Sequence, residues 1–423
     1  MMVERRTPIP VPEAVSRVME FAGTGTKEKV SIEASYGRFL AEDVIADHDV
    51  PHFDRSPYDG FAVRAMDTTN AGLENPIEFE VIEEIGAGSV ATKKVEAFQA
   101  VRIMTGAAMP TECDAVVMLE LTTEYERDGR KFMSIKRPFK SGDNVSFQGE
   151  DTQKGSVLVE KGVFINPGVK ALLATFGYHQ VEVAKKPVVG IYATGTELLD
   201  VHEELVPGKI RNSNAYMISA QIERAGAEPK YFGKLPDDFD LCFEAIKNAI
   251  DEVDILITTG GVSVGDYDYL PAIYEKLGAE VLFNKIAMRP GSVTTVAQLH
   301  GKLLFGLSGN PSACYVGFEL YVRPVVRTRL FSTNPHLLKL KAELDADFPK
   351  PNPFTRFVRS KISFSDGKLV VTPSGLDKSN VVSSLAGANA FMVLPGGTRG
   401  FRKGDEVDVL YLEDQEGSIW PWK

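Results

Sequence analysis

Residues 254–265 read DILITTGGVSVG, an apolar run that passes through two threonines into two adjacent glycines. A continuous apolar run of this length, rather than an alternating one, is typical of a strand that is buried on both faces of a sheet. Adjacent glycines let backbone N–H groups approach an anion closely, and the hydroxyls of Thr259 and Ser263 can add contacts to it. Taken alone, the same stretch is equally compatible with a tight strand-to-helix turn that binds nothing.

Two further segments repeat this order of apolar strand, polar glycine loop and helix. Residues 187–198 read PVVGIYATGTEL and precede a helix expected at residues 213–225. Residues 302–311 read KLLFGLSGNP and precede a helix expected through residue 321. Three such repeats predict a parallel, doubly wound α/β sheet. Because the carboxyl ends of parallel strands meet at one edge of a sheet, we expect the three loops to form one pocket there.

Different patterns flank these repeats. Apolar residues with helical spacing predict a helix at residues 12–22, while Asn166 and Gly177 are suited to begin and end a second helix between them. The region between the two helices is rich in glycine and in short alternating runs, which predicts a small β-rich module inserted into a helical one. The last ~90 residues have closely spaced turn signals, among them Asp366-Gly367, and predict a small β-barrel.

Composition limits the classes of function. A chain of 423 residues is too long for one ordinary core and predicts roughly three or four domains. The formal net charge is −11 and Lys and Arg form no dense run, which argues against nucleic-acid and anionic-membrane partners. No apolar stretch approaches the ~18–20 residues that span a bilayer, and no signal peptide is indicated, so we expect a cytoplasmic protein. Cys113, Cys242 and Cys314 form no C-x-x-C pair, which fits a reducing compartment and gives no support to a zinc or iron–sulfur site.

Two patterns resemble sites of other chemistry, and both are rejected. Residues 86–91, GAGSVA, match the dinucleotide-binding fingerprint, but no clean β-α-β unit follows and no parallel strand is expected to return at the right distance. His48 and His52 have the spacing of metal ligands on a helix, but Pro51 argues against a continuous helix through them. The sequence also contains neither a P-loop lysine motif nor a G-x-S-x-G nucleophile elbow.

Outside the expected sheet, acidic residues lie in two turn-like segments. Residues 54–63 read DRSPYDGFAV, in which a proline-initiated turn presents Asp59 just before a strand. The second segment is Gly149-Glu150-Asp151, near the end of the inserted module. Each segment alone is better explained as an ordinary turn or loop.

Taken together, the segments resemble those of the molybdopterin molybdotransferase family, the MoeA and gephyrin E-domain type. The motifs that carry the resemblance occur in the family's order and span most of the chain. Each is weak by itself, but the ordered set is highly specific. They are 56–63 (SPYDGFAV), 102–107 (RIMTGA), 149–151 (GED), 193–198 (ATGTEL), 259–265 (TGGVSVG), 289–291 (RPG) and 309–311 (GNP).

The resemblance implies four domains and an elongated homodimer. The expected domains are a discontinuous N-terminal domain for linkage and dimerisation (1–52 and 155–184), an inserted β-rich domain (53–154), a doubly wound molybdopterin-binding α/β domain (185–330) and a C-terminal small β-barrel (331–423). Each active site is then expected between the α/β domain of one chain and the inserted domain of the other. This arrangement would explain why Asp59 and Asp151 do not belong to the sheet that carries the glycine loops.

The resemblance also implies an enzyme that inserts molybdate into adenylylated molybdopterin and releases AMP with the help of Mg²⁺. Carboxylates can hold Mg²⁺ through oxygen and water ligands, and the metal can clamp the charge of a pyrophosphate. Replacing molybdate oxygens by sulfur requires protons, so a nearby acid helps. A molybdopterin adenylyltransferase is a further partner to be expected.

Motif positions assign roles to individual residues under this resemblance. The expected catalytic carboxylates are Asp59, Asp151, Glu197, Asp237 and Asp268, with Asp238 as the alternative to Asp237 and with Asp59, Asp151 and Glu197 as Mg²⁺ ligands. The expected substrate-binding residues are Thr105, Thr194, Gly260, Gly261, Ser263, Lys285, Arg289, Ser308 and Pro311. Lys285 and Arg289 would bind an oxyanion or a phosphate, although without the resemblance they read as a solvated strand end.

Two departures from the family pattern and three rival functions remain open. The family often has proline where this chain has Ser308, and Lys-Pro where it has Ser292-Val293, which removes a positive charge from the expected site. The first rival is the same reaction with tungstate, an ion of nearly the same size and charge. The second is a non-catalytic dimeric scaffold of the same fold, and the third is an anion-binding α/β protein of another role.

Overall fold

The structure is a computed structural model, and it describes residues 7–236, 238–261, 269–413 and 417–422. It divides into two compact units. The larger comprises Met1–Glu42, Glu160–Ala174 and Tyr178–Lys423, and the smaller comprises Asp43–Val159 with Thr175–Gly177. Among the described helices, none combines the length and the apolar character needed to cross a membrane.

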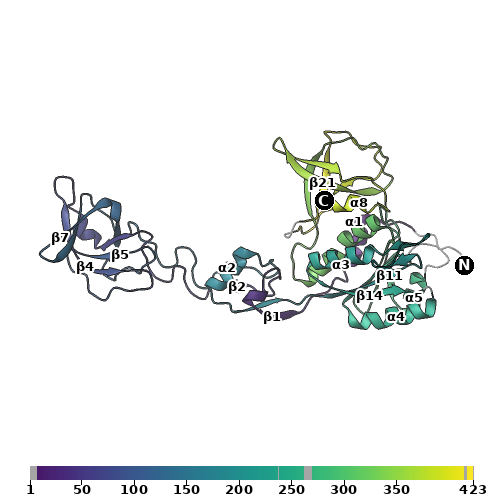
Figure 1. The fold of residues 1–423 in the computed structure, drawn as a ribbon, viewed down its shortest axis with the longest axis horizontal. Coiled ribbons are helices and arrows are strands. Elements are labelled where there is room, and N and C mark those ends of the chain that lie inside the picture. The colour runs from purple at the N-terminus through teal and green to yellow at the C-terminus, as the bar shows by residue number, and fades with distance from the viewer. Residues whose placement is uncertain (1–6, 237, 262–268, 414–416, 423) are drawn as a thin grey trace. The chain divides into compact units, whose positions relative to one another are not determined.

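The smaller unit is built on a sheet with the strand order β6-β3-β5-β4-β8-β7 (Figure 1). Its strands are β3 (Gly60–Val63), β4 (Ile77–Ile85), β5 (Gln99–Ile103), β6 (Ala115–Met118), β7 (Thr122–Arg127) and β8 (Arg130–Ile135). A separate two-stranded sheet pairs β2 (Val44–Ile45) with β9 (Val157–Val159). Inward-facing side chains such as Phe61, Phe79 and Met133 are fully buried in its core. The prediction of an inserted β-rich module is therefore confirmed.

One detail of this sheet corrects the reason given for rejecting the GAGSVA fingerprint. A parallel strand does return, because β4 and β5 pair in parallel on either side of residues 86–98. Those residues contain no helix, however, so the segment lacks the helix N-terminus on which a dinucleotide pyrophosphate rests. The fingerprint is therefore rejected because no helix follows it, and not because a parallel strand is absent.

The larger unit contains a six-stranded sheet with the order β14-β11-β15-β19-β18-β16. The first four strands, β14 (Glu228–Leu235), β11 (Val188–Thr194), β15 (Ile255–Thr259) and β19 (Lys302–Leu307), are parallel as predicted. The last two, β18 (Thr295–Leu299) and β16 (Glu280–Phe283), are antiparallel. The sheet is mixed because β18 and β19 are joined by a two-residue turn at His300-Gly301, where both residues have positive φ (49° and 80°).

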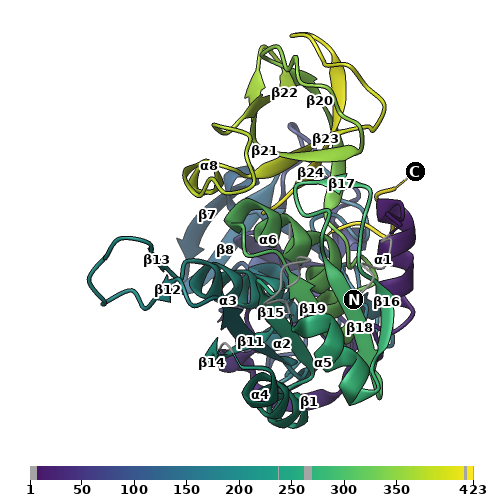
Figure 2. The same ribbon diagram turned by 90° about the vertical axis from the view of Figure 1, so that its right-hand side faces the viewer.

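Helices cover both faces of this sheet, which explains its continuous apolar strands (Figure 2). Ile255 and Ile257 pack on the side of α1 (Val11–Met19), α3 (Asn214–Ala225) and α6 (Pro311–Gly317), which continues through a π-helical turn (Phe318–Val322) into α7 (Arg323–Arg329). Leu256 packs on the opposite side against α4 (Phe239–Glu252) and α5 (Leu270–Leu277). Since successive side chains of a strand point to opposite faces, both sets must be apolar.

The predicted helix ends are largely confirmed. The helix α3 ends at Gly226 in a left-handed conformation (φ 101°), and α2 (Pro167–Thr175) begins after Asn166, whose side chain accepts a 2.9 Å hydrogen bond from the N–H of Val169. The first helix, α1, ends at Met19, three residues before the predicted end. Beside α2, β1 (Lys27–Ser31) pairs antiparallel with β10 (Gln180–Ala184).

The C-terminal part is a closed barrel, as predicted. Strands β21 (Thr355–Ser365), β22 (Lys368–Pro373), β20 (Leu338–Leu344), β24 (Glu406–Tyr411) and β23 (Ala390–Leu394) pair in that order, and β23 pairs back to β21. The turn between β21 and β22 is Asp366-Gly367, with positive φ at both residues. The short helix α8 (Ser383–Ala386) lies between β22 and β23, and β17 (Met288–Arg289) adds to β21, which connects the α/β domain to the barrel.

Candidate active site

The three glycine loops lie together at the carboxyl ends of β11, β15 and β19. Hydrogen bonds link each loop to its neighbour: Thr194 Oγ1 donates to the carbonyl of Thr259 (3.0 Å), and the N–H of Gly260 donates to the carbonyl of Leu307 (2.9 Å). The side-chain amide of Asn214, in the first turn of α3, donates to the carbonyl of Gly309 (2.8 Å). The pocket expected from the strand order is therefore present.

Only glycine fits at the centre of this arrangement. Gly260 has φ +91°, and a Cβ atom there would lie 2.5 Å from Thr194 Oγ1 and 3.0 Å from the carbonyl oxygen of Thr194. Gly195 has φ +133°, and a Cβ there would lie 2.4 Å from a carboxylate oxygen of Glu197. The glycines thus let the β11 and β15 loops touch and let the Glu197 carboxylate fold back over its own loop.

A first cavity of about 540 Å³ opens above these loops. One side of it is polar, and the other side is apolar and comes from α4 and α5. Its lining residues are Thr194, Gly195, Thr196, Glu197, Leu235, Pro236, Cys242, Gly260, Gly261, Tyr269, Leu270, Ile273 and Gly309. A cavity of this size with one apolar wall is suited to a small organic ligand that carries polar groups at one end.

A second cavity of about 830 Å³ shares Glu197, Gly260, Gly261 and Gly309 with the first and extends toward the barrel. Its lining includes three cationic side chains, Arg289, Arg356 and Lys378, and two anionic ones, Glu197 and Asp377. The remaining lining residues are Ile210, Pro290, Gly291, Ser292, Val293, Ser308, Asn310, Ala313, Ser379 and Asn380. Among the lining residues that the structure describes, the cations outnumber the anions although the whole chain carries a formal charge of −11, which suits this part of the cavity to an anion.

Of the predicted basic and loop residues, some line the second cavity and others do not. Arg289 lines the second cavity, whereas Lys285 is not part of the described lining of either cavity. Ser308 lines the second cavity, and its hydroxyl accepts a 3.2 Å hydrogen bond from the N–H of Asn310. Pro311 instead begins α6, a position at which its fixed φ and missing N–H are tolerated. Ser292 and Val293, which stand where the family often has Lys-Pro, also line this cavity, and its described positive charge comes from Arg289, Arg356 and Lys378.

In the smaller unit, Asp59 and Thr105 form one group. Asp59 precedes β3 and Thr105 follows β5, and these two strands are paired, so their ends are adjacent. Asp59 Oδ1 accepts hydrogen bonds from the N–H (2.7 Å) and the hydroxyl (3.0 Å) of Thr105. These two bonds, the backbone one being the larger cause, lower the pKa of the Asp59 carboxyl below its ordinary value. Asp59 is therefore ionised at neutral pH, which suits it to bind a cation rather than to donate a proton.

The other predicted carboxylates lie in different situations. Asp151 is exposed in the loop of the smaller unit, where its N–H donates to the carbonyl of Val50 (3.0 Å). Asp238 is the N-cap of α4 and accepts a 2.9 Å hydrogen bond from the N–H of Leu241, so it is engaged in a structural contact. Asp237, Asp268 and Ser263 lie outside the described residues.

No group of three His, Cys, Asp or Glu side chains suited to a metal occurs among the residues that the structure describes. His48 and His52 lie in a loop with their rings edge to face, 5.4 Å apart. Mg²⁺ is commonly held by one or two carboxylates together with substrate phosphates and water. The ionised, exposed carboxylate of Asp59 fits such a mode, in which the substrate itself completes the ligand set.

The barrel contributes residues to the second cavity that were not predicted from the sequence. Arg356, Lys378, Ser379 and Asn380 line the second cavity, yet none belongs to a glycine loop of the sheet. The sequence offers one weak signal, namely that Arg356 and Arg359 flank the apolar pair Phe357-Val358 near the start of β21. Cations in a buried strand need a partner, and that partner, Asp377, could not be identified without the fold.

The fold and the paired cavities define a multidomain α/β protein with a polar site at the carboxyl ends of its parallel strands. Three family models match the chain: the MoeA N-terminal region (domain I and II) at residues 9–177, a probable molybdopterin binding domain at residues 190–328, and the MoeA C-terminal region (domain IV) at residues 341–412. The chain belongs to the MoeA family.

Named relatives and solved structures agree with this assignment. The molybdopterin molybdenumtransferase of Bacillus subtilis (strain 168) is 63% identical over 421 residues, which cover 100% of this chain and 98% of the relative. That of Staphylococcus aureus (strain COL) is 51% identical and covers 98% of both chains. The crystal structure of the molybdopterin biosynthesis moeA protein from Pyrococcus horikoshii OT3 is 33% identical with a TM-score of 0.81, over 96% of this chain and 100% of that chain.

Proposed function

We propose that this chain is a molybdopterin molybdenumtransferase that inserts molybdate into adenylylated molybdopterin and releases AMP. Full-length identity of 63% to a relative of that name supports the transferase activity and the place in molybdenum cofactor biosynthesis. The observation that carries the chemistry is the pair of joined cavities at the strand ends. One cavity has an apolar wall suited to an organic ligand, and the described lining of the other has more cationic than anionic side chains, which suits an oxyanion.

In this proposal the two cavities hold the two substrates next to each other. Molybdate is a tetrahedral dianion, and Arg289, Arg356 and Lys378 offer donors and positive charge for it. The molybdopterin part lies against the glycine loops, whose backbone approaches the ligand closely. The two thiol groups of the dithiolene can then bond to molybdenum, while molybdate oxygens leave as water after taking up the thiol protons and further protons from solvent.

The Mg²⁺ ion, the homodimer and the cytoplasmic location are part of the same proposal. Mg²⁺ would be held by Asp59, with Asp151 and Glu197 as further ligands, and would neutralise the pyrophosphate charge as AMP departs. Exposed apolar side chains beside Asp59 and Thr105, namely Tyr58 and Met104, favour a surface that a second copy of the chain covers. The three cysteines are free and buried, in keeping with a reducing compartment.

The variant Asp59→Asn tests this function. It keeps the size of the side chain but loses the charge that would hold Mg²⁺, so we expect molybdate-dependent AMP release to fall by at least about 100-fold with an unchanged melting temperature. The measurement is AMP release from adenylylated molybdopterin with and without molybdate. Asp143→Asn is the matched control, because Asp143 also accepts a hydrogen bond from a backbone N–H in the smaller unit. Wild-type activity in Asp59→Asn would contradict this function and would favour the third rival, an anion-binding α/β protein of another role.

A further inference from the structure

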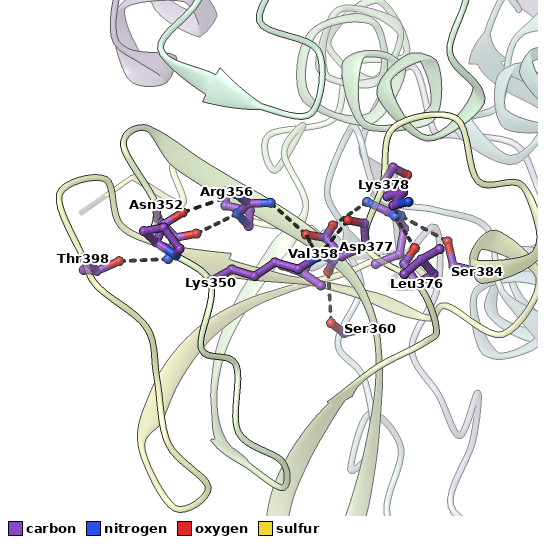
Figure 3. A network of polar contacts seen from close by, with 12 residues as sticks. Lys350, Asn352, Arg356, Val358, Ser360, Leu376, Asp377, Lys378, Ser384 and Thr398 are labelled. Atoms are coloured by element: carbon purple, nitrogen blue, oxygen red, sulfur yellow. Dashed lines mark hydrogen bonds and ion pairs between the residues drawn. The ribbon is translucent and has the colours of Figure 1, made fainter.

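Asp377 lies in the barrel, between β22 and β23, and is surrounded by three cationic side chains (Figure 3). Arg356 Nη1 lies 2.8 Å from Asp377 Oδ2, Arg359 Nη1 lies 3.1 Å from Oδ1, and Lys350 Nζ lies 3.5 Å from Oδ2. The side chain of Asp377 is 6% exposed and that of Arg359 only 1%. Both carboxylate oxygens are therefore engaged, as a charge in so dry a place requires.

Arg359 fixes the backbone on both sides of Asp377. Its Nη2 donates to the carbonyls of Leu376 (3.2 Å) and Lys378 (3.1 Å), and its Nε donates to Ser384 Oγ (3.3 Å). A guanidinium can make all these contacts at once because its donors form a rigid planar fork. Arg359 therefore holds the backbone on both sides of Asp377, and Lys350 Nζ donates to the Asp377 carbonyl between them (3.0 Å).

The far end of the same loop is tied to the α/β domain. The N–H of Ser312, in the first turn of α6, donates to the carbonyl of Ser379 (3.0 Å), and its hydroxyl donates to the carbonyl of Val381 (2.6 Å). The loop that precedes α6 carries Ser308, Gly309 and Asn310, which line the second cavity. Residues 377–380 are thus held between the barrel and the sheet edge, and they line the same cavity.

Asp377 also orients Arg356. The Arg356 guanidinium donates to Asp377 through Nη1 (2.8 Å) and to Asn352 Oδ1 through Nε (2.6 Å). Asn352 is fully buried, and its amide donates to Thr398 Oγ1 (2.9 Å). In contrast, neither Arg289 nor Lys378 forms an ion pair with any residue in the described ranges. Within the described part of the chain, the cavity therefore combines two cations that have no acidic partner, Arg289 and Lys378, with Arg356, whose orientation is fixed by Asp377 and Asn352.

We propose that Arg359 and Asp377 are positioning residues for the oxyanion: they hold Arg356 and the 376–380 loop in the arrangement that binds molybdate. Neither is placed in contact with the reacting atoms. Because the loop and the Arg356 side chain are already ordered, less conformational entropy is lost when the anion binds. This inference rests on the proposed function and adds to it a specific role for the barrel.

The variant Arg359→Lys tests the inference because it keeps the charge and loses the planar fork. We expect the KM for molybdate to rise about tenfold, while the KM for adenylylated molybdopterin and kcat at saturating molybdate change less than about twofold. Molybdate binding to the protein without pterin, measured by titration calorimetry, should weaken by the same factor. Asp408→Asn is the control: Asp408 forms ion pairs with Lys339 and Lys341 in the same barrel and is not among the described lining residues of the cavity.

A second variant covers the case in which Arg359→Lys does not fold. Ser312→Ala removes only the hydroxyl contact to Val381, and we expect a rise in the KM for molybdate of about threefold with kcat retained. Folded variants that bind molybdate as the wild type does, or that lose only thermal stability, would overturn the positioning role. If the wild-type protein itself releases no AMP in response to molybdate, the proposed function fails and not merely this inference.

Discussion

Gly260 shows how one residue type decides the geometry of the site. Its position after a buried strand predicts a close approach of backbone to a ligand, and the structure identifies what the glycine approaches within the protein. The missing Cβ leaves room for Thr194, whose hydroxyl bridges to the carbonyl of Thr259. Three strand ends can then meet without a side chain between them. The same glycine also leaves open the floor shared by both cavities.

The variant Gly260→Ala should therefore destabilise the protein more than an alanine at a positive φ normally does. Its Cβ would overlap Thr194, so β11 and β15 must separate at their ends, and we expect a loss of roughly 2–4 kcal/mol in unfolding free energy with strongly reduced AMP release. Urea unfolding and the AMP assay measure the two effects. Gly233→Ala is the control, because Gly233, in β14 of the same sheet, also has positive φ (+100°) but nothing within 4 Å of the added atom. Equal losses for the two variants would contradict a steric role for Gly260.

At the scale of the element, the end of β14 and the start of α4 illustrate the limit of motif matching. The adjacent pair Asp237 and Asp238 allowed either residue to be the functional carboxylate. In the structure Asp238 caps α4, with its carboxylate bound to the N–H of Leu241. A helix beginning leaves N–H groups without partners, and an aspartate is well suited to satisfy one of them. Helix capping is thus sufficient to explain Asp238.

We expect Asp238→Ala to cost about 1 kcal/mol of stability and to leave kcat and both KM values within about twofold of the wild type. The loss arises because the N–H of Leu241 loses its acceptor. Asp238→Ser, which can still cap the helix, should restore most of the stability. Thermal melting and steady-state AMP release provide the measurements, and a loss of kcat that serine does not restore would assign Asp238 a catalytic role instead.

For the whole molecule, the proposed dimer makes a quantitative prediction. If Asp59 of one chain and Arg289 of the other serve the same site, two inactive proteins, Asp59→Asn and Arg289→Ala, should complement each other when mixed and reassembled. Half of the dimers in an equal mixture are then mixed, and each has one intact site, so about one quarter of wild-type activity should return.

The control for this experiment is a chain that carries both substitutions, mixed with wild-type chains. It also yields about one quarter of the activity when sites are shared, but about one half when each site lies within one chain. Size-exclusion chromatography with light scattering gives the oligomeric state of each mixture. No recovered activity in the mixture of single variants, despite exchange of chains, would exclude a shared site of this composition.

The sequence by itself determined the elements that depend on local patterns. The buried strands at residues 255–259 and 302–307, the helix that ends at Gly226 and the Asp366-Gly367 turn follow from apolar periodicity and from the φ freedom of glycine. The pocket at the strand ends followed too, because parallel strands present their carboxyl ends at one edge. The ordered motifs led correctly to the MoeA family.

Only the tertiary structure decided which distant residues share a site. The pairing of β3 with β5 joins Asp59 to Thr105, and barrel closure carries Arg356 and the loop after Asp377 to the cavity that Gly260 opens. Sequence spacing cannot reveal such contacts, because they depend on strand pairing and packing between segments more than 40 residues apart. The glycine pair of residues 260 and 261 thus predicted a pocket, and the fold determined which cations surround it.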